Sequence, residues 1–587
     1  MIVPMKKVVL LALESGAREA LEELRNAGVM QIDRAEQGSA DTASLLEKRA
    51  HALRILAELE RIGKPAAAPD PALSGAEVLE HAAAALEKRN AAESDAEKFR
   101  RRLDRLEPWG DFDAGCLKKL RKQGVTVTLV EGDEKKFAAA GALEGFCCRE
   151  ISREGKTVYF VLLGTTEPDP ELFPGVVLAD DDDPGLLYDK LEKCRAAQSE
   201  AQAELVRCAA SVSLVKEEIS GLTSAVEFHQ AADALTDAGP VVYLSGFVPE
   251  PQIDVLREAA KKNGWGLLIR DPGADEIVPV LVKENRFSRV IKPLFDFIGV
   301  LPGYREMDVS AGVLVFFTIF YAMIIGDAGY GALFLLIALV CKAKFRKKEA
   351  LRTPINLFIL LSCATSVWGA LSGNWFGIPG LPGIKWLTDP ETKDTNVQFF
   401  CFLLAFAQLG VGRVWRAVHE GGLRSYIRHF GWTFIILGNL LLTLKIIVWP
   451  GDFPVIMYWV YGIGLAMVMV ADVNWRDPAD CFQFPFSVIG SFTDVLSYIR
   501  LFAVGMAGSC IASSFNSMGV DAMHAHLWAI PVGVLAILCG HALNIALGFM
   551  SVLVHGVRLN TLEFSNHTGL SWSGQPFKPF KKHDTED

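Results

Sequence analysis

The chain has 587 residues and a formal net charge of −10 at pH 7. This length exceeds what one hydrophobic core usually holds, so two or more domains are expected. Residues 1–299 contain 39 Lys and Arg against 51 Asp and Glu, whereas residues 300–587 contain 20 against 18 and carry long apolar runs. The first half has the composition of an acidic soluble protein and the second that of a membrane protein. Neither half has the strongly basic composition that would indicate binding to nucleic acid.

The sequence argues against three classes of protein: metal-binding, nucleotide-hydrolysing and secreted. Eleven cysteines lie without the paired spacing of metal ligands, so we expect no metal site, no cofactor and a reducing cytoplasm. Gly155–Thr157 matches the end of a phosphate-binding loop, but Glu150 stands where that loop requires glycine. We therefore expect the chain to be non-catalytic toward nucleotides by itself. The N-terminal MIVPMKKVVLLALESG lacks a small-residue cleavage site and predicts a β-strand, not a signal peptide.

Residues 1–299 predict a cytoplasmic domain of α/β lobes joined by long helical hairpins. The chain opens with a strand at Lys7–Leu13, a helix at Ala17–Ala27 that Gly28 ends, and a second strand at Val29–Ile32. Segments rich in Ala, Leu, Glu, Lys and Arg follow at 45–62, 75–106 and 186–219, with the apolar spacing of coiled coils. We expect a proximal lobe at about 1–40 and 238–290, a distal lobe at about 110–175, and hairpins at about 45–108 and 185–232.

Residues 300–587 predict an all-α membrane domain of about eight transmembrane helices. The apolar run from Ser310 to Val340 is broken by GDAGYG at 326–331, whose glycines favour a pair of short spans. Further spans are expected at about 353–375, 397–412, 429–449, 454–472, 484–516 and 526–559. The last two, at about 484–516 and 526–560, are the candidate ion-translocating helices.

Loop charges predict how this domain is oriented. Six Lys and Arg lie between residues 342 and 352, after the second span, and four arginines lie between 413 and 428, after the fourth. The intervening loop at 377–396 holds only two lysines. Because positively charged loops stay on the cytoplasmic side, eight spans place both termini and the acidic half in the cytoplasm. The pattern predicts a multi-pass cell-membrane protein.

An arginine interrupts the apolar stretch DVLSYIRLFAVG at residues 494–505. Arg500 costs roughly 2.5–3.5 kcal/mol at the centre of a span, and its guanidinium cannot lose its proton to avoid that cost. Small residues at 503, 507 and 514 share its helix face and would let another surface come close. The structural alternative is a static pair with Asp494, but two residues six apart on one helix do not face each other.

A polar stripe runs along the last span. His541, Asn544, Gly548, Ser551, His555 and Arg558 follow one another at spacings of three and four, which is one face of a continuous α-helix. A lone histidine in such a helix is more often a satisfied core residue. Polar residues aligned over a whole span commonly mark ion or proton paths, so we expect a water-lined or ion-conducting face.

These spans resemble a known family. SFTDVLSYIRLFAVGMAGSCIASSFN and GHALNIALGFMSVLVHGVRLNTLEF are similar to the last two spans of the membrane stator subunit of rotary V-type ATPases, called subunit I in bacteria and archaea and subunit a in eukaryotes. SGFVPE, LPGYREMD, FTIFYAMIIGDAGYG and SVWGALSGNWFG extend the resemblance over nearly the whole chain. The family usually has Asp-Pro-Thr at 308–310, where this chain has Asp-Val-Ser, and the end after Glu563 diverges. Gly508 and Gly548 stand where some eukaryotic members have His and Glu, so those roles do not carry over.

The resemblance implies an ion-translocating stator subunit that forms half-channels against a rotating ring of carboxylate-bearing subunits. Arg500 would attract each arriving carboxylate, make it release its ion and block leakage between the half-channels. The implied partners are ring subunits of the c or K type, peripheral stalks held by the N-terminal half, a central-stalk socket subunit, H⁺ or Na⁺, and the bilayer of a bacterial or archaeal cell. The residues expected to act in ion translocation are Arg500, Arg558, His541, Asn544, Ser551, His555, Ser497 and Glu563.

The main alternative is a secondary ion-coupled transporter with a cytoplasmic coiled-coil regulatory domain. That class predicts an internal repeat with broken helices in both halves, which we do not find in the sequence. A voltage sensor would need several arginines at three-residue spacing on one helix. A membrane-anchored scaffold would explain the hairpins and leave the polar stripe unexplained.

Overall fold

The computed structural model describes residues 2–33, 38–63, 73–110, 112, 114–166, 168–169, 172–173, 183–283, 285–378, 382–526 and 529–582. The chain forms two compact units. The arm unit comprises Leu11–Gly28, Ile32–Leu244 and Phe580–Asp587. The membrane unit comprises Met1–Leu10, Val29–Gln31 and Ser245–Pro579.

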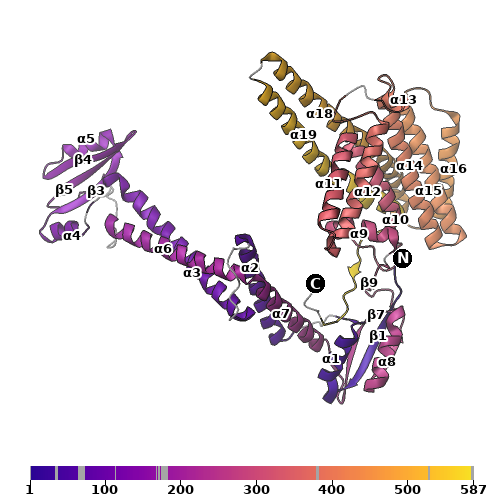
Figure 1. Cartoon of the computed structure of the whole chain (residues 1–587), viewed down its shortest axis with the longest axis horizontal. Coiled ribbons are helices and arrows are strands. Elements are labelled where there is room, and N and C mark those ends of the chain that lie inside the picture. The colour runs from indigo at the N-terminus through magenta and orange to yellow at the C-terminus, as the bar shows by residue number, and fades with distance from the viewer. Residues whose placement is uncertain are drawn as a thin grey trace. The chain divides into compact units, whose positions relative to one another are not determined.

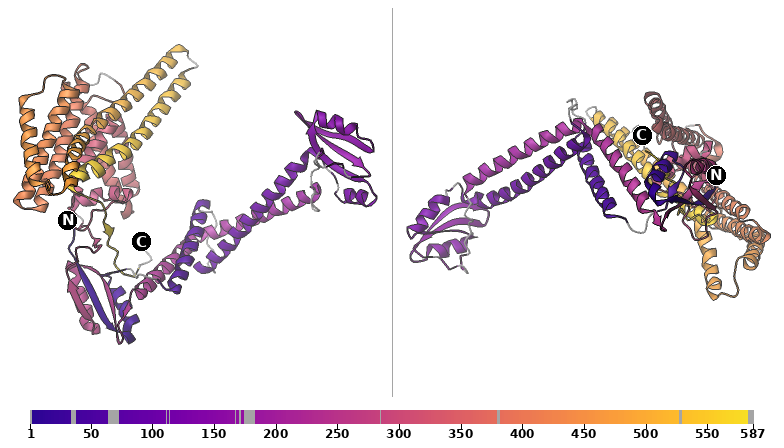
Figure 2. Two further views of the ribbon diagram at one scale, coloured as in Figure 1. Left: turned by 180° about the vertical axis from the view of Figure 1, so that it is seen from behind. Right: turned by 90° about the horizontal axis from the view of Figure 1, so that it is seen from below.

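A long helical pair and a small sheet form most of the arm unit. Helices α3 (Gly75–Leu106) and α6 (Pro184–Ala210) run side by side, and the sheet lies next to one end of the pair (Figures 1 and 2). The sheet is antiparallel with the order β3-β5-β4, and the alternating Val158, Phe160 and Leu162 of its central strand are buried. Its elements are α4 (Ala114–Lys122), β3 (Thr126–Asp133), α5 (Glu134–Gly141), β4 (Phe146–Glu154) and β5 (Thr157–Gly164).

Polar contacts join the end of one further helix of the arm unit to the start of another. Asp233, the last residue of α7 (Val212–Asp233), accepts hydrogen bonds from Ser39 N and Thr42 Oγ1 at 2.9 and 2.7 Å, at the start of α2 (Ala40–Ile62). Burial opposes ionisation of Asp233, but these hydrogen bonds outweigh it and lower the pKa of the carboxyl. The predicted single helix over 186–219 is wrong. Ser211 leaves the helical conformation (φ −102°, ψ 24°) between α6 and α7, a break that apolar spacing does not reveal.

The first elements agree closely with the sequence patterns. The predicted strand at Lys7–Leu13 is β1 (Met5–Leu13), and α1 (Ala17–Ala27) has the predicted bounds and ends at Gly28 in the left-handed conformation. The strand expected at 29–32 is the shorter β2 (Gln31–Ile32). These strands belong to a five-stranded sheet with the order β2-β7-β1-β8, in which β6 also pairs with β7. The remaining elements are β6 (Thr236–Asp237), β7 (Val241–Pro249), α8 (Ile253–Asn263) and β8 (Gly266–Arg270).

The membrane unit consists mainly of helices. Among the residues described, five helical stretches are long and apolar enough to cross a membrane, and Ser310–Ile325 and Val455–Ala471 are shorter apolar helices. The count of eight spans therefore stays a prediction. The elements are β9 (Pro279–Val280), α9 (Arg286–Ile298), α10 (Ser310–Ile325), α11 (Ala328–Lys344), α12 (Glu349–Leu371), α13 (Lys385–Thr388), α14 (Lys393–Glu420), α15 (Leu423–Thr443), α16 (Val455–Ala471), α17 (Pro478–Leu496), α18 (Ile499–Ala525), α19 (Ile530–Ser551), α20 (Phe564–Thr568) and β10 (Gln575–Pro576).

Helices α18 and α19 form a long hairpin that lies obliquely to the other membrane helices (Figures 1 and 2). Within the chain, 22% of the apolar window over Pro478–Ala525 and 17% of that over Ile530–Thr568 are buried, against 56% over Leu423–Val448. The hairpin therefore exposes most of its apolar surface. Exposed apolar surface of this extent marks contact with lipid or with another protein.

Candidate functional site

Arg500 lies in the first turn of α18 and forms an ion pair with a carboxylate near the end of the chain. Its Nη2 donates to Glu563 Oε1 at 2.8 Å, and its Nε donates to the carbonyl of Ser497 at 2.9 Å. The Arg500 and Glu563 side chains are 20% and 5% exposed. Arg558 Nε lies 3.4 Å from the same Glu563 oxygen. The structure thus brings together four of the predicted residues, and the partner of Arg500 is Glu563 instead of Asp494.

Two π-helical turns carry Arg558 and Glu563 into this position. The helix continues from α19 through π turns at Val552–Gly556 and Leu559–Glu563. Each such turn rotates the residues that follow it relative to an unbroken α-helix, and such turns occur frequently at functional sites. The prediction of one continuous α-helical stripe is therefore wrong beyond Ser551. The sequence carries no simple signal for a π turn.

A buried chain of hydrogen bonds supports the Arg500 turn. Tyr498 Oη donates to Gln408 Oε1 at 2.5 Å, and Gln408 Nε2 donates to Asn560 Oδ1 at 2.9 Å. Asn560 in turn donates to the carbonyl of Gly556 at 3.0 Å. The Tyr498, Gln408 and Asn560 side chains are at most 2% exposed. Sequence reasoning missed these residues, although each is a polar group within an apolar run.

Asp494 belongs to a second group of charged residues. Arg413 Nε donates to Nδ1 of His567 at 2.9 Å, and His567 Nε2 lies 3.0 Å from Asp494 Oδ2. Because an arginine only donates, Nδ1 must accept, and the proton of the neutral ring sits on Nε2 and points to Asp494. His567 therefore acts as a fixed link from α14 to α17.

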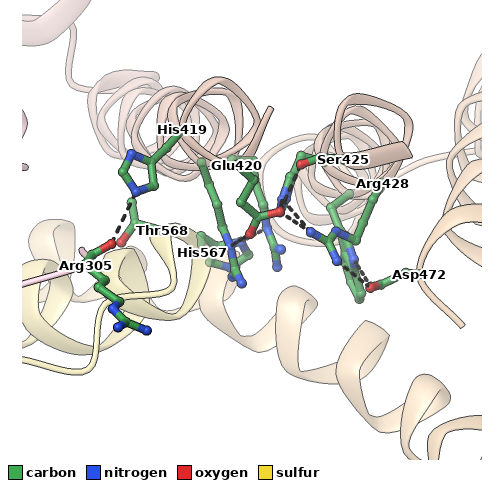
Figure 3. A network of polar contacts seen from close by, with 12 residues as sticks. Arg305, His419, Glu420, Ser425, Arg428, Asp472, His567 and Thr568 are labelled. Atoms are coloured by element: carbon green, nitrogen blue, oxygen red, sulfur yellow. Dashed lines mark hydrogen bonds and ion pairs between the residues drawn. The ribbon is translucent and has the colours of Figure 1, made fainter. Parts of the chain in front are cut away.

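A further group of charged residues lies where α14 ends and α15 begins. Figure 3 shows Glu420 between His419 on one side and Arg428 with Asp472 on the other. The Glu420 carboxylate accepts from Ser425 Oγ at 2.9 Å, lies 3.0 Å from His429 Nε2 and pairs with Arg428. Along Arg416, Glu420, Arg428 and Asp472 the charges alternate in sign, so these four side chains pair with one another.

Away from Arg500, a chain of hydrogen bonds joins the α18–α19 hairpin to α11. Asn544 Nδ2 donates to Tyr330 Oη at 3.1 Å, and Tyr330 Oη lies 2.6 Å from His541 Nδ1. His541 Nε2 lies 3.0 Å from Asn516 Oδ1, and the Asn516 amide donates to the carbonyl of Phe376 at 2.7 Å. That last bond fixes the orientation of the amide, so His541 Nε2 donates and Nδ1 accepts from Tyr330. Two residues of the predicted stripe therefore bind Tyr330, which the sequence did not identify as a partner.

Asp327 fixes the loop next to this chain. Its carboxylate is 2% exposed and accepts four backbone N–H groups, those of residues 329, 330, 376 and 377. One of these belongs to Phe376, a residue other than glycine with a positive φ of 52°. The carboxylate thus ties the start of α11 to an unfavourable loop conformation.

Two cavities lie beside α18. One, of about 290 Å³, is lined by Tyr330, Ala507, Gly508 and the stripe residues Asn544, Gly548 and Ser551. The other, of about 280 Å³, lies against Gly505 and Ser509 and reaches Asn374, Lys393 and Asp394. His555 lies half-buried on the first π turn, between the cavity region and Arg558. Within the described ranges, no group of three or more His, Cys, Asp or Glu could hold a metal ion.

Comparison with known proteins gives relatives along the whole chain, although no protein-family model matches it. V-type ATP synthase subunit I of Borreliella burgdorferi is 31% identical over 614 residues, which cover 99% of this chain and 100% of that protein. V-type ATP synthase subunit I 1 of Treponema pallidum is 31% identical over 633 residues with the same coverage. A-type ATP synthase subunit I of Pyrococcus abyssi is 28% identical over 57% of this chain and 53% of its own length.

Among solved structures, the cytoplasmic N-terminal domain of a V-ATPase subunit I matches 45% of this chain and 99% of its own at 16% identity. The TM-score of 0.20 is too low to show a common fold. The family instead follows from the two relatives that are 31% identical over nearly the full length of both chains. The protein belongs to the family of V-type ATP synthase subunit I.

Proposed function

We propose that this chain is the ion-translocating stator subunit in the membrane sector of a rotary V/A-type ATP synthase. The main support is the position of Arg500. This permanently charged side chain lies half-buried at the start of the α18–α19 hairpin, whose apolar surface is mostly exposed. From Arg500, a strip of exposed small residues continues along α18 at three- and four-residue spacing: Ala503, Ala507, Cys510, Ser514 and Ser517. Small residues allow a neighbouring helix to approach closely and to slide past.

The proposed partner of this strip is a ring of small membrane subunits, each with one buried carboxylate. A carboxylate that reaches Arg500 is stabilised in its ionised form, since an opposite charge within a few ångströms favours ionisation. It therefore releases the proton or sodium ion that it carried. Because the guanidinium never becomes neutral, it also prevents an ion from passing between the two sides without the ring.

Access to Arg500 differs on its two sides. Toward the α18–α19 turn, the two cavities provide space for water next to Gly505, Gly508 and Ser551. Their walls are mainly apolar and include the polar side chains of Ser509, Asn544 and Ser551. On the side of Arg500 away from that turn lie Glu563 and then the pair of Asp494 and His567. Arg413 connects this pair to α14, whose end carries further charged residues. We assign the outer half-channel to the cavities and the inner path to the charged groups.

The predicted stripe provides a test of the outer path. Replacing Asn544, Ser551 and His555 together by Leu should lower ATP-driven ion flux on the order of tenfold, because alkyl groups give water no hydrogen-bond partner. Ring association should stay nearly intact. The measurement is ion uptake into vesicles that contain the reconstituted complex. A control with Met550 and Val554 replaced by Leu, both exposed on the same helix, should retain the normal flux; equal flux in both variants would contradict a wet path along the stripe.

The cytoplasmic half has a mechanical role in this proposal. The α3–α6 pair and its terminal sheet would hold the peripheral stalks against the torque of rotation, and the membrane unit would also meet the central-stalk socket subunit. Four arginines between residues 413 and 428, at the end of α14 and the start of α15, favour a cytoplasmic position for the turn between these helices and for both termini. The complex would then sit in the cell membrane with its nucleotide-binding subunits in the cytoplasm.

Cysteine labelling tests this orientation. In a background without reactive native cysteines, a cysteine at Glu391 should react with a membrane-impermeant maleimide added outside intact cells. A cysteine at Lys347 should react only after the membrane is opened, because the basic loop stays inside. Both positions are exposed. Reversed labelling of the pair would overturn the orientation and the cytoplasmic placement of the arm unit.

A further inference from the structure

Among the residues that the structure describes, the cluster around Arg500 has one more positive charge than negative. Arg500 and Arg558 both reach the same Oε1 atom of Glu563, at 2.8 and 3.4 Å. Arginine side chains stay protonated, so two positive charges face one negative charge. Asp494 is engaged by His567 and does not complete the balance. The cluster can therefore accept one further carboxylate and become neutral.

Glu563 is held at only one of its two carboxylate oxygens. Its Oε2 atom is buried and, among the residues that the structure describes, has no hydrogen-bond partner. Most buried polar atoms in proteins have at least one partner. With nothing bound to Oε2, the carboxylate can turn from one guanidinium toward the other without breaking another hydrogen bond.

A ring carboxylate paired with an arginine in this environment would be hard to release. Ion pairs are stronger at low dielectric than in water, and departure of the carboxylate would leave a buried arginine without a counter-ion, which is the costly case for buried pairs. A rotary mechanism needs this pair to form and break at every step. A second carboxylate that takes the place of the departing one would remove that cost.

We infer that Glu563 is the exchangeable counter-ion of Arg500. This inference rests on the proposed function. When a ring carboxylate arrives, Arg500 pairs with it and Glu563 remains with Arg558. When the ring carboxylate leaves, Glu563 pairs with Arg500 again, as in the structure. Glu563 is then a positioning residue that holds the Arg500 guanidinium in place and lowers the cost of releasing the ring carboxylate from it.

The experiment uses the complete complex in lipid vesicles and compares Glu563→Gln and Glu563→Asp with the unchanged protein. Two quantities are measured: the rate of ATP-driven ion uptake and the number of ions moved per ATP hydrolysed. Glu563→Gln should slow uptake by about tenfold or more, the usual effect of losing one charge-assisted hydrogen bond on a release step. The ions moved per ATP should not change, because Arg500 still blocks leakage. Glu563→Asp retains the charge on a shorter side chain and should give an intermediate rate.

Glu391→Gln, an exposed loop position, is the matched control for the loss of one carboxylate and should be unchanged. Normal uptake by Glu563→Gln, or a fall in the ions moved per ATP, would overturn the counter-ion role. If Glu563→Gln prevents assembly, the Asp variant decides: slower uptake at the same ratio supports the inference, and an unchanged rate contradicts it. Arg500→Leu, measured in parallel, distinguishes failure of the counter-ion inference from failure of the proposed function. Coupled uptake by that variant would refute the proposed function itself.

Discussion

Arg500→Leu should abolish coupled ion transport, with ATP-driven uptake reduced at least about a hundredfold, while the protein still inserts and assembles. Leucine removes the insertion cost of the arginine, roughly 2.5–3.5 kcal/mol, and Glu563 keeps its contact with Arg558. Loss of a purely structural arginine would therefore lower stability or assembly, and the complexes that do assemble would still couple transport to ATP hydrolysis. If Arg500 is the stator charge, its loss removes the positive partner that makes the ring carboxylate ionise and release its ion. Uptake into reconstituted vesicles, with assembly checked on the same samples, distinguishes these outcomes.

Arg500→Lys should be nearly as severe as Arg500→Leu. The guanidinium donates to Glu563 through Nη2 and to the Ser497 carbonyl through Nε, and the compact ammonium of lysine cannot reproduce this planar fork. Arg558→Lys is the matched control, because the Arg558 side chain is 54% exposed and water can partly replace its contacts. A mild Arg500→Lys together with a severe Arg558→Lys would reverse the assigned roles of the two arginines.

The second large effect concerns the stability of the membrane unit. Asp327→Ala should destabilise it by more than about 3 kcal/mol, because several buried N–H groups would lose their acceptor at once. The loop that contains Phe376, with its positive φ, would also lose the carboxylate that fixes it. The quantity to measure is the unfolding midpoint of the purified protein in detergent.

Two variants control for the loss of Asp327. Asp327→Asn retains an oxygen acceptor in nearly the same shape and should cost much less. Asp389→Ala removes an exposed aspartate that accepts a bond from the Glu391 N–H in a loop of the same unit, and it should shift the midpoint little. An Asp327→Ala midpoint close to that of Asp389→Ala would show that the buried carboxylate does not hold the loop.

Much of the fold follows from local sequence patterns. The bounds of α1 and α3 agree with apolar spacing and with end signals such as Gly28, because a helix is defined mainly by its own residues and caps. The break at Ser211 and the π turns after Ser551 did not follow, since both lie in segments of ordinary helical composition without a turn or cap signal. The number of spans also remains a prediction, because two apolar helices of the membrane unit are short for a bilayer.

The site could be predicted in part. Arg500, Arg558 and Glu563 were identified from intramembrane polarity and family resemblance, and the structure brings them together. The pairing itself was not predictable, because Arg500 and Glu563 are 63 residues apart and only tertiary packing joins them. The supporting residues Gln408 and Tyr330 were missed for the same reason, since the contacts that explain them lie on other helices.

The most direct measurement asks whether the exposed face of α18 meets the ring. Cys510 is exposed on that face, so it can serve as a native cross-linking residue against a cysteine placed beside the ring carboxylate. Cys363, which is exposed on α12, is the control. If the ring meets this face, Cys510 should form a disulfide that stops ATP-driven ion uptake and is reversed by a reductant, and Cys363 should form none. A ring that cross-links to Cys363 and never to Cys510 would contradict contact at this face.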